Sequence, residues 1–208
     1  MAEEDISHAV LDRYRAGDRD FRGINLRGCF YAGVDLSNID LSGANLAFAN
    51  LSNANLIGAI LDKADLSGTD VQGANLIGVS LVGARLIATR MSHAKMLATN
   101  LSLTNMSSGN LSGSSMVFSQ FTDAKLMGVD ASHTNFGGAD MSRVDFRSAN
   151  LRMAGFLHTN LEDANFSKAN LEEANFRGAL NLTPKQIKAG INWQKAYYDP
   201  EFRELLQI

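Results

Sequence analysis

The sequence predicts an all-β solenoid of about eight coils, with short α-helical segments at both ends. Three observations lead to this fold class. From Phe21 to Phe176 every fifth residue, 32 positions in all, is apolar or aromatic, with no insertion or deletion. Two residues before it stands Ala, Ser, Thr, Cys, Gly or Val in 29 of the 32 pentads. Phenylalanines near the C-terminus recur at intervals of twenty residues.

A period of five excludes both common secondary structures. In a helix, five steps of about 100° overshoot one turn by about 140°, so the apolar residues would not line up. In a flat strand an odd period sends alternate repeats to opposite faces. The remaining solution is a chain that turns by a constant amount in every pentad. The apolar residue, called the central residue below, then always points to one axis.

Each position of the pentad has a predicted role. The small residue lies two before the central one, so in an extended segment both point inward. The residue between them is Asn or Asp in 22 of 32 pentads, and it points outward, where its side chain can hydrogen-bond nearby backbone. Thirteen of the 18 glycines lie two residues after the central one. That placement suits a corner of the coil at which the backbone needs a positive φ.

The phenylalanines indicate four pentads per coil. A twenty-residue coil places Phe136, Phe156 and Phe176 in one stacked column and Phe146 and Phe166 in the opposite one, whereas a fifteen-residue coil would scatter them. Stacked rings make favourable apolar contacts. With about 4.8 Å between hydrogen-bonded layers, the rod would be roughly 35–40 Å long.

The repeats resemble the pentapeptide-repeat family over about residues 19–180. The resemblance is carried by tandem A(N/D)LXX units such as Ala44-Asn45-Leu46, Ala54-Asn55-Leu56, Ala164-Asn165-Phe166 and Ala174-Asn175-Phe176. It implies a right-handed quadrilateral parallel β-helix with four pentapeptides per coil. The segments before and after the repeats are similar to those of free-standing pentapeptide-repeat proteins abundant in cyanobacteria.

The chain divides into three parts by this interpretation. We expect an N-terminal helical cap at residues 1–18, the solenoid at 19–180, and a C-terminal helical cap at 181–208. Residues 5–16 read as a helix with an apolar face that ends near Gly17. Helix starts are expected at Thr183-Pro184 and at Asp199-Pro200.

Composition narrows the function. The formal net charge of −3 is typical neither of a nucleic-acid-binding protein nor of a nucleic-acid mimic. The single cysteine, Cys29, excludes an internal disulfide and falls at an inward position. No stretch is apolar and long enough for a secretory signal or a membrane span, so we expect a cytoplasmic protein with no membrane partner.

No catalytic pattern is present in the sequence. The four histidines, His8, His93, His133 and His158, are too dispersed to share a metal ion. Arg85, Arg90 and Lys95 face three different sides of one coil and are interpreted as a solvated ring. We therefore expect no enzyme activity, no metal, no cofactor and no small-molecule substrate.

One outward column differs from the others. The residue after the central one is usually Ser or charged, but in one stacked column it is largely apolar. With two neighbours, the candidate strip consists of Ile57, Ile60, Ile77, Leu97, Val117, Phe118 and Leu157. Two interpretations remain open: such residues merely suit an exposed sheet, or they form a strip for a protein partner or for self-association.

The sequence is compatible with three functions. The leading hypothesis is a non-catalytic protein–protein interaction module, a rigid scaffold or regulator with an unidentified protein partner or with itself as a homodimer. The alternative, implied by the resemblance alone, is a DNA mimic that modulates DNA gyrase. That role needs an acidic rod, and residues 21–180 hold 13 acidic and 12 basic residues, a net charge of −1. A purely structural role is the third.

Overall fold

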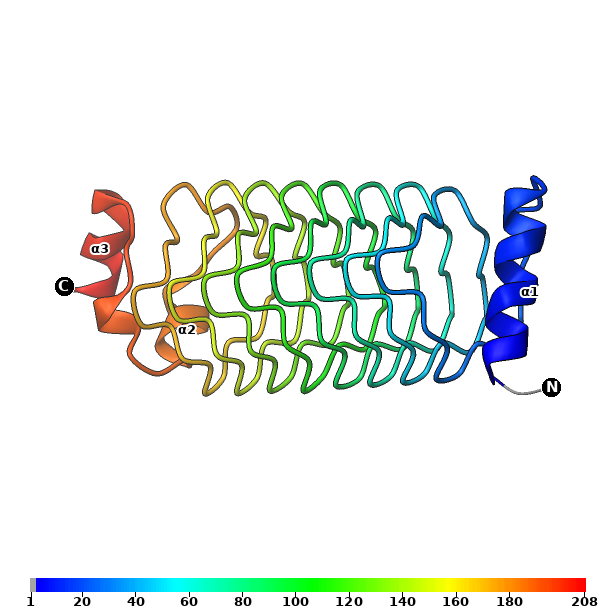
Figure 1. Cartoon of the computed structure of the whole chain (residues 1–208). Coiled ribbons are helices and arrows are strands. Elements are labelled where there is room, and N and C mark those ends of the chain that lie inside the picture. Colours follow the sequence, from blue (N-terminus) through cyan, green and yellow to red (C-terminus); the bar gives the residue numbers. More distant parts are fainter. Residues whose placement is uncertain (1–2) are drawn as a thin grey trace.

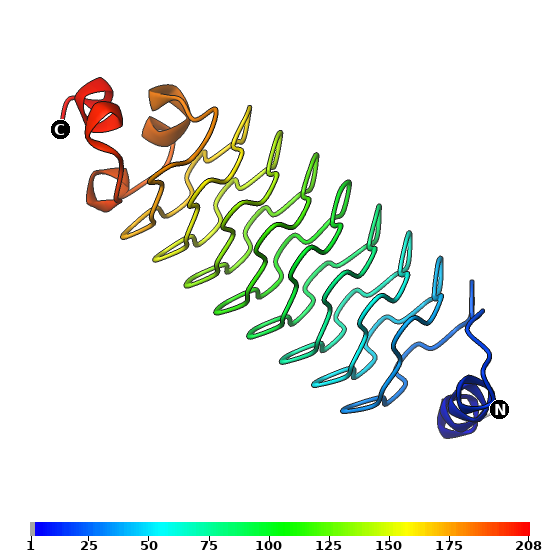
Figure 2. The same ribbon diagram turned by 90° about the horizontal axis from the view of Figure 1, so that it is seen from above.

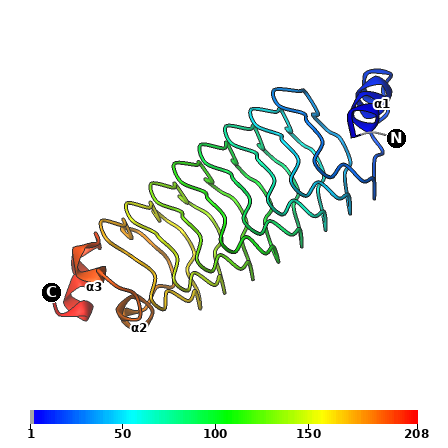
Figure 3. The same cartoon turned by 60° about the horizontal axis from the view of Figure 1, so that its bottom comes forward.

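The computed structural model describes residues 3–208, which form an elongated solenoid with helices at both ends (Figure 1). Residues 1–2 of the expected N-terminal segment lie outside the described residues. Helix α1 (Glu3–Arg15) precedes the repeats, and α2 (Pro184–Lys188), the 3₁₀-helix η1 (Trp193–Lys195) and α3 (Pro200–Leu206) follow them. Views from two further directions place α1 at one end of the stack and α2 and α3 at the other (Figures 2 and 3).

The backbone pairing has a period of twenty residues. Parallel single-residue bridges join each residue before a central one to its equivalent twenty positions later, from Asp20 with Asp40 to Asn160 with Leu180. The Leu46 N–H donates to the Asp65 carbonyl at 2.7 Å, and the Asp65 N–H donates to the Ala44 carbonyl at 2.9 Å. Each coil therefore holds four pentads, as the phenylalanine columns predict. Residues 20–179 make eight such coils.

A β-turn follows every central residue. The N–H of the fourth turn residue donates back to the central carbonyl, as from Ala44 to Leu41 at 2.9 Å. The third turn residue has a positive φ in all 32 pentads, in thirteen glycines and nineteen other residues, while the second does not. This is the type II signature. No Val, Ile or Thr occupies the third position, where a β-branched side chain would be most strained.

The core is a set of side-chain columns along the axis. All 32 central residues are buried, with the small residues packed beside them. The Phe136 and Phe156 rings stack at 5.3 Å between centroids, Phe156 and Phe176 at 4.8 Å, and Phe146 and Phe166 at 5.5 Å. The two predicted phenylalanine columns are thus confirmed.

At the N-terminal end, α1 packs on the first coil through Val10 and Tyr14. The Tyr14 hydroxyl donates to the Ser37 carbonyl at 2.9 Å, and the Asp20 N–H donates to the Asp18 carboxylate at 3.0 Å. These bonds engage backbone groups of a coil that has no preceding coil to pair with. That α1 protects this end against unfolding stays a prediction.

At the C-terminal end, the backbone pairing continues beyond the last repeat with a changed spacing. Ile191 pairs with Asn170, and Tyr197 pairs with Asn175, at separations of 21 and 22 residues. Residues 180–198 thus follow the course of a further, irregular coil into which α2 and η1 are inserted. Tyr198 extends one phenylalanine column by stacking on Phe176 at 5.7 Å.

A reciprocal pair of variants tests the turn geometry. Ala88 (φ 54°) and Gly128 (φ 65°) hold the same turn position two coils apart, and a Cβ at Gly128 would meet nothing within 4 Å. Because a left-handed conformation costs a residue with a Cβ about 1–2 kcal/mol, Ala88→Gly should stabilise by about 1 kcal/mol and Gly128→Ala should destabilise by a similar amount. Denaturant midpoints measure both. If the two variants shifted the denaturant midpoint in the same direction, the left-handed conformation assigned to this turn position would be contradicted.

Alkaline pH should destabilise the protein through Tyr31, a fully buried side chain in the first coil. Burial raises the pKa of Tyr31 from 10.0 to about 12, and its proximity to Cys29 acts in the same direction. The folded state holds the proton of the Tyr31 hydroxyl more tightly than the unfolded state does. The protonated hydroxyl therefore makes its full contribution to the free energy of unfolding below pH 10, and that contribution is lost as the pH rises towards 12. Melting temperatures between pH 9 and 12 should fall less steeply for Tyr31→Phe than for wild type. Tyr197→Phe, at a ring that is 47% exposed, is the control; equal slopes for all three proteins would refute the role of Tyr31.

Candidate functional site

The candidate strip lies along one edge of the solenoid, at the fourth turn of each coil. Its main column holds the second turn residues, which point outward because the central residue before them points inward. The Gly58 N–H donates to the Ile77 carbonyl at 3.1 Å, and the Gly78 N–H donates to the Leu97 carbonyl at 3.0 Å. The structure therefore brings Ile57, Ile77, Leu97, Val117 and Leu157 into one ladder.

These side chains are exposed to solvent. The exposed fraction is 39% for Ile57, 40% for Leu97 and 48% for Leu157, while Ile77 and Val117 are partly exposed. Ile60, 40% exposed, lies on the adjoining side of the coil. We call all seven residues of the strip, Phe118 included, the apolar ridge.

Phe118 widens the ridge in a way that depends on its backbone. It is the third residue of its turn, with φ 59° and 66% exposure. Its ring lies over Gly138 of the next coil, where an added Cβ would come within 2.6 Å of the ring atoms. The pentad pattern places Phe118 on the surface, but only the left-handed conformation shows that its ring covers the following coil.

The ridge is interrupted by a notch at Gly137. This residue occupies the ladder position between Val117 and Leu157 and has no side chain. A Cβ built there would lie 3.2 Å from the Asn135 Oδ1 and 3.6 Å from the Leu157 carbonyl oxygen, and the φ of Gly137 is not positive. A side chain can therefore be added at the notch without backbone strain and with only a small shift of Asn135.

The second turn of each coil supplies a contrasting column, two turns away around the coil. Its second residues include Ser67, Ile87, Ser107 and Met127, so apolar and polar residues alternate. Met127 is 45% exposed and Ile87 is partly exposed. This second-turn column has the same backbone geometry as the ridge without its continuous apolar character.

The histidines and the cysteine lie apart from the apolar ridge's main column and do not gather at one place. His8, His93, His133 and His158 are all exposed, and Cys29 is buried. Among the residues whose side chains the structure describes, no three His, Cys, Asp or Glu side chains lie close enough to hold a metal ion. No helix among these residues could cross a membrane, since the longest, α1, has 13 residues.

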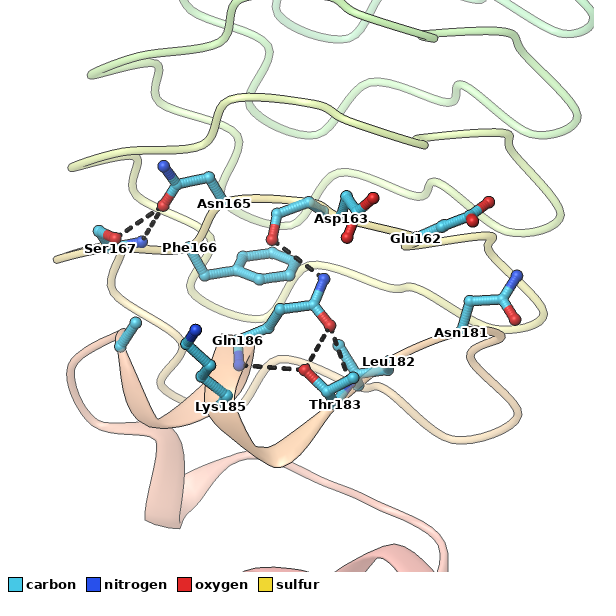
Figure 4. Close-up of a pocket in the computed structure, with 12 residues that line it drawn as sticks. Glu162, Asp163, Asn165, Phe166, Ser167, Asn181, Leu182, Thr183, Lys185 and Gln186 are labelled. Atoms are coloured by element: carbon cyan, nitrogen blue, oxygen red, sulfur yellow. Dashed lines mark hydrogen bonds between the residues drawn. The ribbon is translucent and has the colours of Figure 1, made fainter.

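One open pocket of ≈ 820 Å³ lies where α2 takes the place of a regular pentad (Figure 4). Its lining includes Glu162, Phe166, Thr183 and Gln186. The Gln186 amide nitrogen donates to the Leu161 and Ala164 carbonyls at 2.8 and 3.0 Å.

The Gln186 amide oxygen accepts from the Thr183 N–H at 2.8 Å and from its hydroxyl at 2.7 Å, within the capping box of α2. The polar groups of this amide are therefore committed to the start of α2 and to the first pentad of the last coil.

Comparisons with known proteins agree with this architecture. The sequence model of the family described as "Pentapeptide repeats" matches this chain in eight copies, which together span residues 20–180. No curated protein matches the chain. HetL, a pentapeptide repeat protein involved in heterocyst differentiation regulation from the cyanobacterium Nostoc sp. strain PCC 7120, is 28% identical. The two align over 90% of this chain and 92% of HetL, with a TM-score of 0.40.

Two further solved structures are similar to this chain. A trypsin-treated variant of QnrB1, a plasmid-mediated fluoroquinolone resistance protein, is 19% identical over 91% of this chain and 90% of its own, with a TM-score of 0.56. Rfr23 from the cyanobacterium Cyanothece 51142 is 17% identical over 92% of this chain and 99% of its own, with a TM-score of 0.23. The likeness to QnrB1 is one of fold. Given the repeat match over most of its length, the chain belongs to the pentapeptide-repeat family.

Proposed function

We propose that this protein is a non-catalytic interaction module, a rigid rod that docks a folded protein on its apolar ridge. The observation that carries the proposal is the column of exposed or partly exposed apolar side chains, Ile57, Ile77, Leu97 and Val117, at one turn of four successive coils. The solenoid does not require them, because the second-turn column has the same geometry with serines at alternate positions. Surface apolar residues gathered in this way are typical of interaction sites.

The proposal includes the finer features that the family resemblance implies. We take the coil to be right-handed and square in cross-section, with the end helices acting as caps. A rod of stacked, hydrogen-bonded coils is stiff, so residues along one edge keep a fixed spacing of about 4.8 Å. A preorganised row of anchors loses little conformational entropy when a partner binds.

A pair of aspartates tests the ridge. Charges at its centre would be stripped of water in any complex yet remain exposed in the free rod. We expect Ile77→Asp plus Leu97→Asp to abolish protein capture, whether the captured protein is another species or a second copy. The melting temperature should fall by only a few degrees, since outward positions add little to the core.

The matched control is Ile87→Asp plus Met127→Asp, two apolar residues at the same turn position in the second-turn column. Affinity capture from native lysate and circular dichroism are measured on wild type and both variants. If the folded ridge variant retains every protein that wild type retains, the ridge is ordinary surface and the proposal falls.

The gyrase alternative makes an opposite prediction. Mimicry of DNA needs rows of unpaired negative charge, but several carboxylates here face a neighbouring arginine. A hydrogen bond from Arg22 lowers the pKa of Asp20 to about 2. The Asp123 carboxylate accepts two hydrogen bonds from Arg143, at 2.7 and 2.8 Å.

We therefore expect no inhibition of gyrase supercoiling at micromolar protein. A titration of supercoiling activity measures this, with a strongly acidic pentapeptide-repeat protein as the positive control. Inhibition comparable to that control would overturn the charge argument and promote the alternative.

A further inference from the structure

The apolar ridge has an order of side-chain sizes that is informative about its occupant. From the first coil to the eighth the ladder reads Ser37, Ile57, Ile77, Leu97, Val117, Gly137, Leu157 and Arg177. Its midpoint lies between Leu97 and Val117, which is also the middle of the eight-coil stack. A two-fold axis through this point would overlap two rods along their full length.

We propose that the occupant of the ridge is a second copy of this chain, antiparallel to the first and related to it by a two-fold axis between Leu97 and Val117. The inference rests on the proposed function and names the partner for the same surface. Two such rods share one spacing between coils, so their ladders can pair coil against coil.

The paired side chains are complementary in size. In this register Ile77 faces the notch at the partner's Gly137, and the same contact occurs a second time through the two-fold axis. Leu97 faces Val117 of the other copy, and Ile57 faces Leu157. The notch would be filled by an isoleucine, so the interruption of the ladder becomes a recognition feature instead of a defect.

The third turn residues are complementary in the same register. Phe118, the most exposed member of the ridge, faces Ala98 of the other copy, and His158 faces Gly58. In a parallel arrangement the two Gly137 notches would meet each other and remain empty. Unfilled notches give poor packing.

Charge selects the same arrangement. On the side of the coil before the ridge, the antiparallel register sets Asp35 against Asn175 and Lys95 against Ser115. On the side after it, Asp40 meets Leu180, and in the ridge Arg177 meets Ser37. No like charges oppose one another at these positions.

A parallel two-fold axis runs along the rods and exchanges the sides before and after the ridge. It would set Arg177 against Arg177 of the other copy and Asp35 against Asp40 of the other copy, and directly opposed like charges are destabilising. Electrostatics and packing therefore favour the same antiparallel register.

The size of the ridge sets the strength of the expected dimer. A column one residue wide, extended by Ile60 and Phe118, offers a few hundred Å² of apolar surface per copy, below the roughly 800 Å² per partner of a stable interface. The dimer should therefore dissociate on dilution. Its population must be measured as a function of concentration by sedimentation equilibrium.

Disulfide trapping tests the register directly. In a Cys29→Ala background, chains with Ile57→Cys are mixed with chains with Leu157→Cys and oxidised. The antiparallel register places these two thiols opposite each other, within reach of a disulfide. Two copies of residue 57 would lie five coils apart, about 24 Å, so each variant alone should not cross-link.

The parallel arrangement reverses this pattern. Cross-linking of each variant alone, or none in the mixture, overturns the proposal. A mixture of Ile87→Cys and Met127→Cys chains, on the second-turn column, controls for random collision and should give no dimer.

Sedimentation equilibrium of three variants completes the test. Ile77→Asp plus Leu97→Asp should weaken the dimer by about 100-fold, and Gly137→Leu, which fills the notch, by about tenfold or more. Ile87→Asp plus Met127→Asp should match wild type. Gly137→Leu distinguishes two kinds of contact. The added leucine would strengthen a non-specific apolar contact, but it would weaken a dimer in which Ile77 fills the notch.

The two proposals fail separately. Wild type that stays monomeric at every concentration, yet captures a different protein through the ridge, overturns the self-association proposal and leaves the proposed function standing. If wild type neither captures another protein nor associates with itself, both the proposed function and the self-association proposal are overturned.

Discussion

The rest of the structure depends on one backbone constraint: a turn every five residues whose third residue is left-handed. That turn directs each pentad onto the next side of the coil, and four of them bring the chain back beneath its starting point. The N–H and C=O groups left unpaired within a pentad then pair with groups one coil away, as Leu46 N–H does with the Asp65 carbonyl and Asp65 N–H with the Ala44 carbonyl. Core columns and outward columns both follow from this repeat, so a side chain's surroundings are set by its position in the pentad and its coil.

Much of the fold can be predicted from the sequence because a strict period is visible without tertiary information. The 32 central residues are the core, and spacings such as Phe136 to Phe156 identify the twenty-residue coil. The C-terminal end could not be predicted in this way. After Phe176 the period stops, and the separations of 21 and 22 residues at Ile191 and Tyr197 depend on how α2 and η1 are inserted.

The apolar ridge, too, could be predicted from the sequence only in part. Its members could be named from the sequence, since residues twenty apart share one side. The shape of the surface that they form could not be predicted. The direction of the Phe118 ring over Gly138 follows from a positive φ, and the Gly137 notch matters only when the ladder beside it is known to be exposed. The solenoid constrains inward residues strongly and outward residues weakly. The apolar outward column is therefore the surface to which we assign the proposed partner contact.

The central claim is that the pentad determines the fold while the twenty-residue coil determines the surface. Two insertions after Ala84 separate them: one extra pentad, a copy of residues 80–84, and one extra coil, a copy of residues 65–84. Both keep the period of five, but the pentad rotates all later coils by one turn and splits the ridge. Circular dichroism melting and sedimentation equilibrium should show two cooperatively folded proteins, of which only the one with the added pentad has lost self-association. A pentad insertion that unfolds the protein, or that folds and still associates like wild type, would contradict the account.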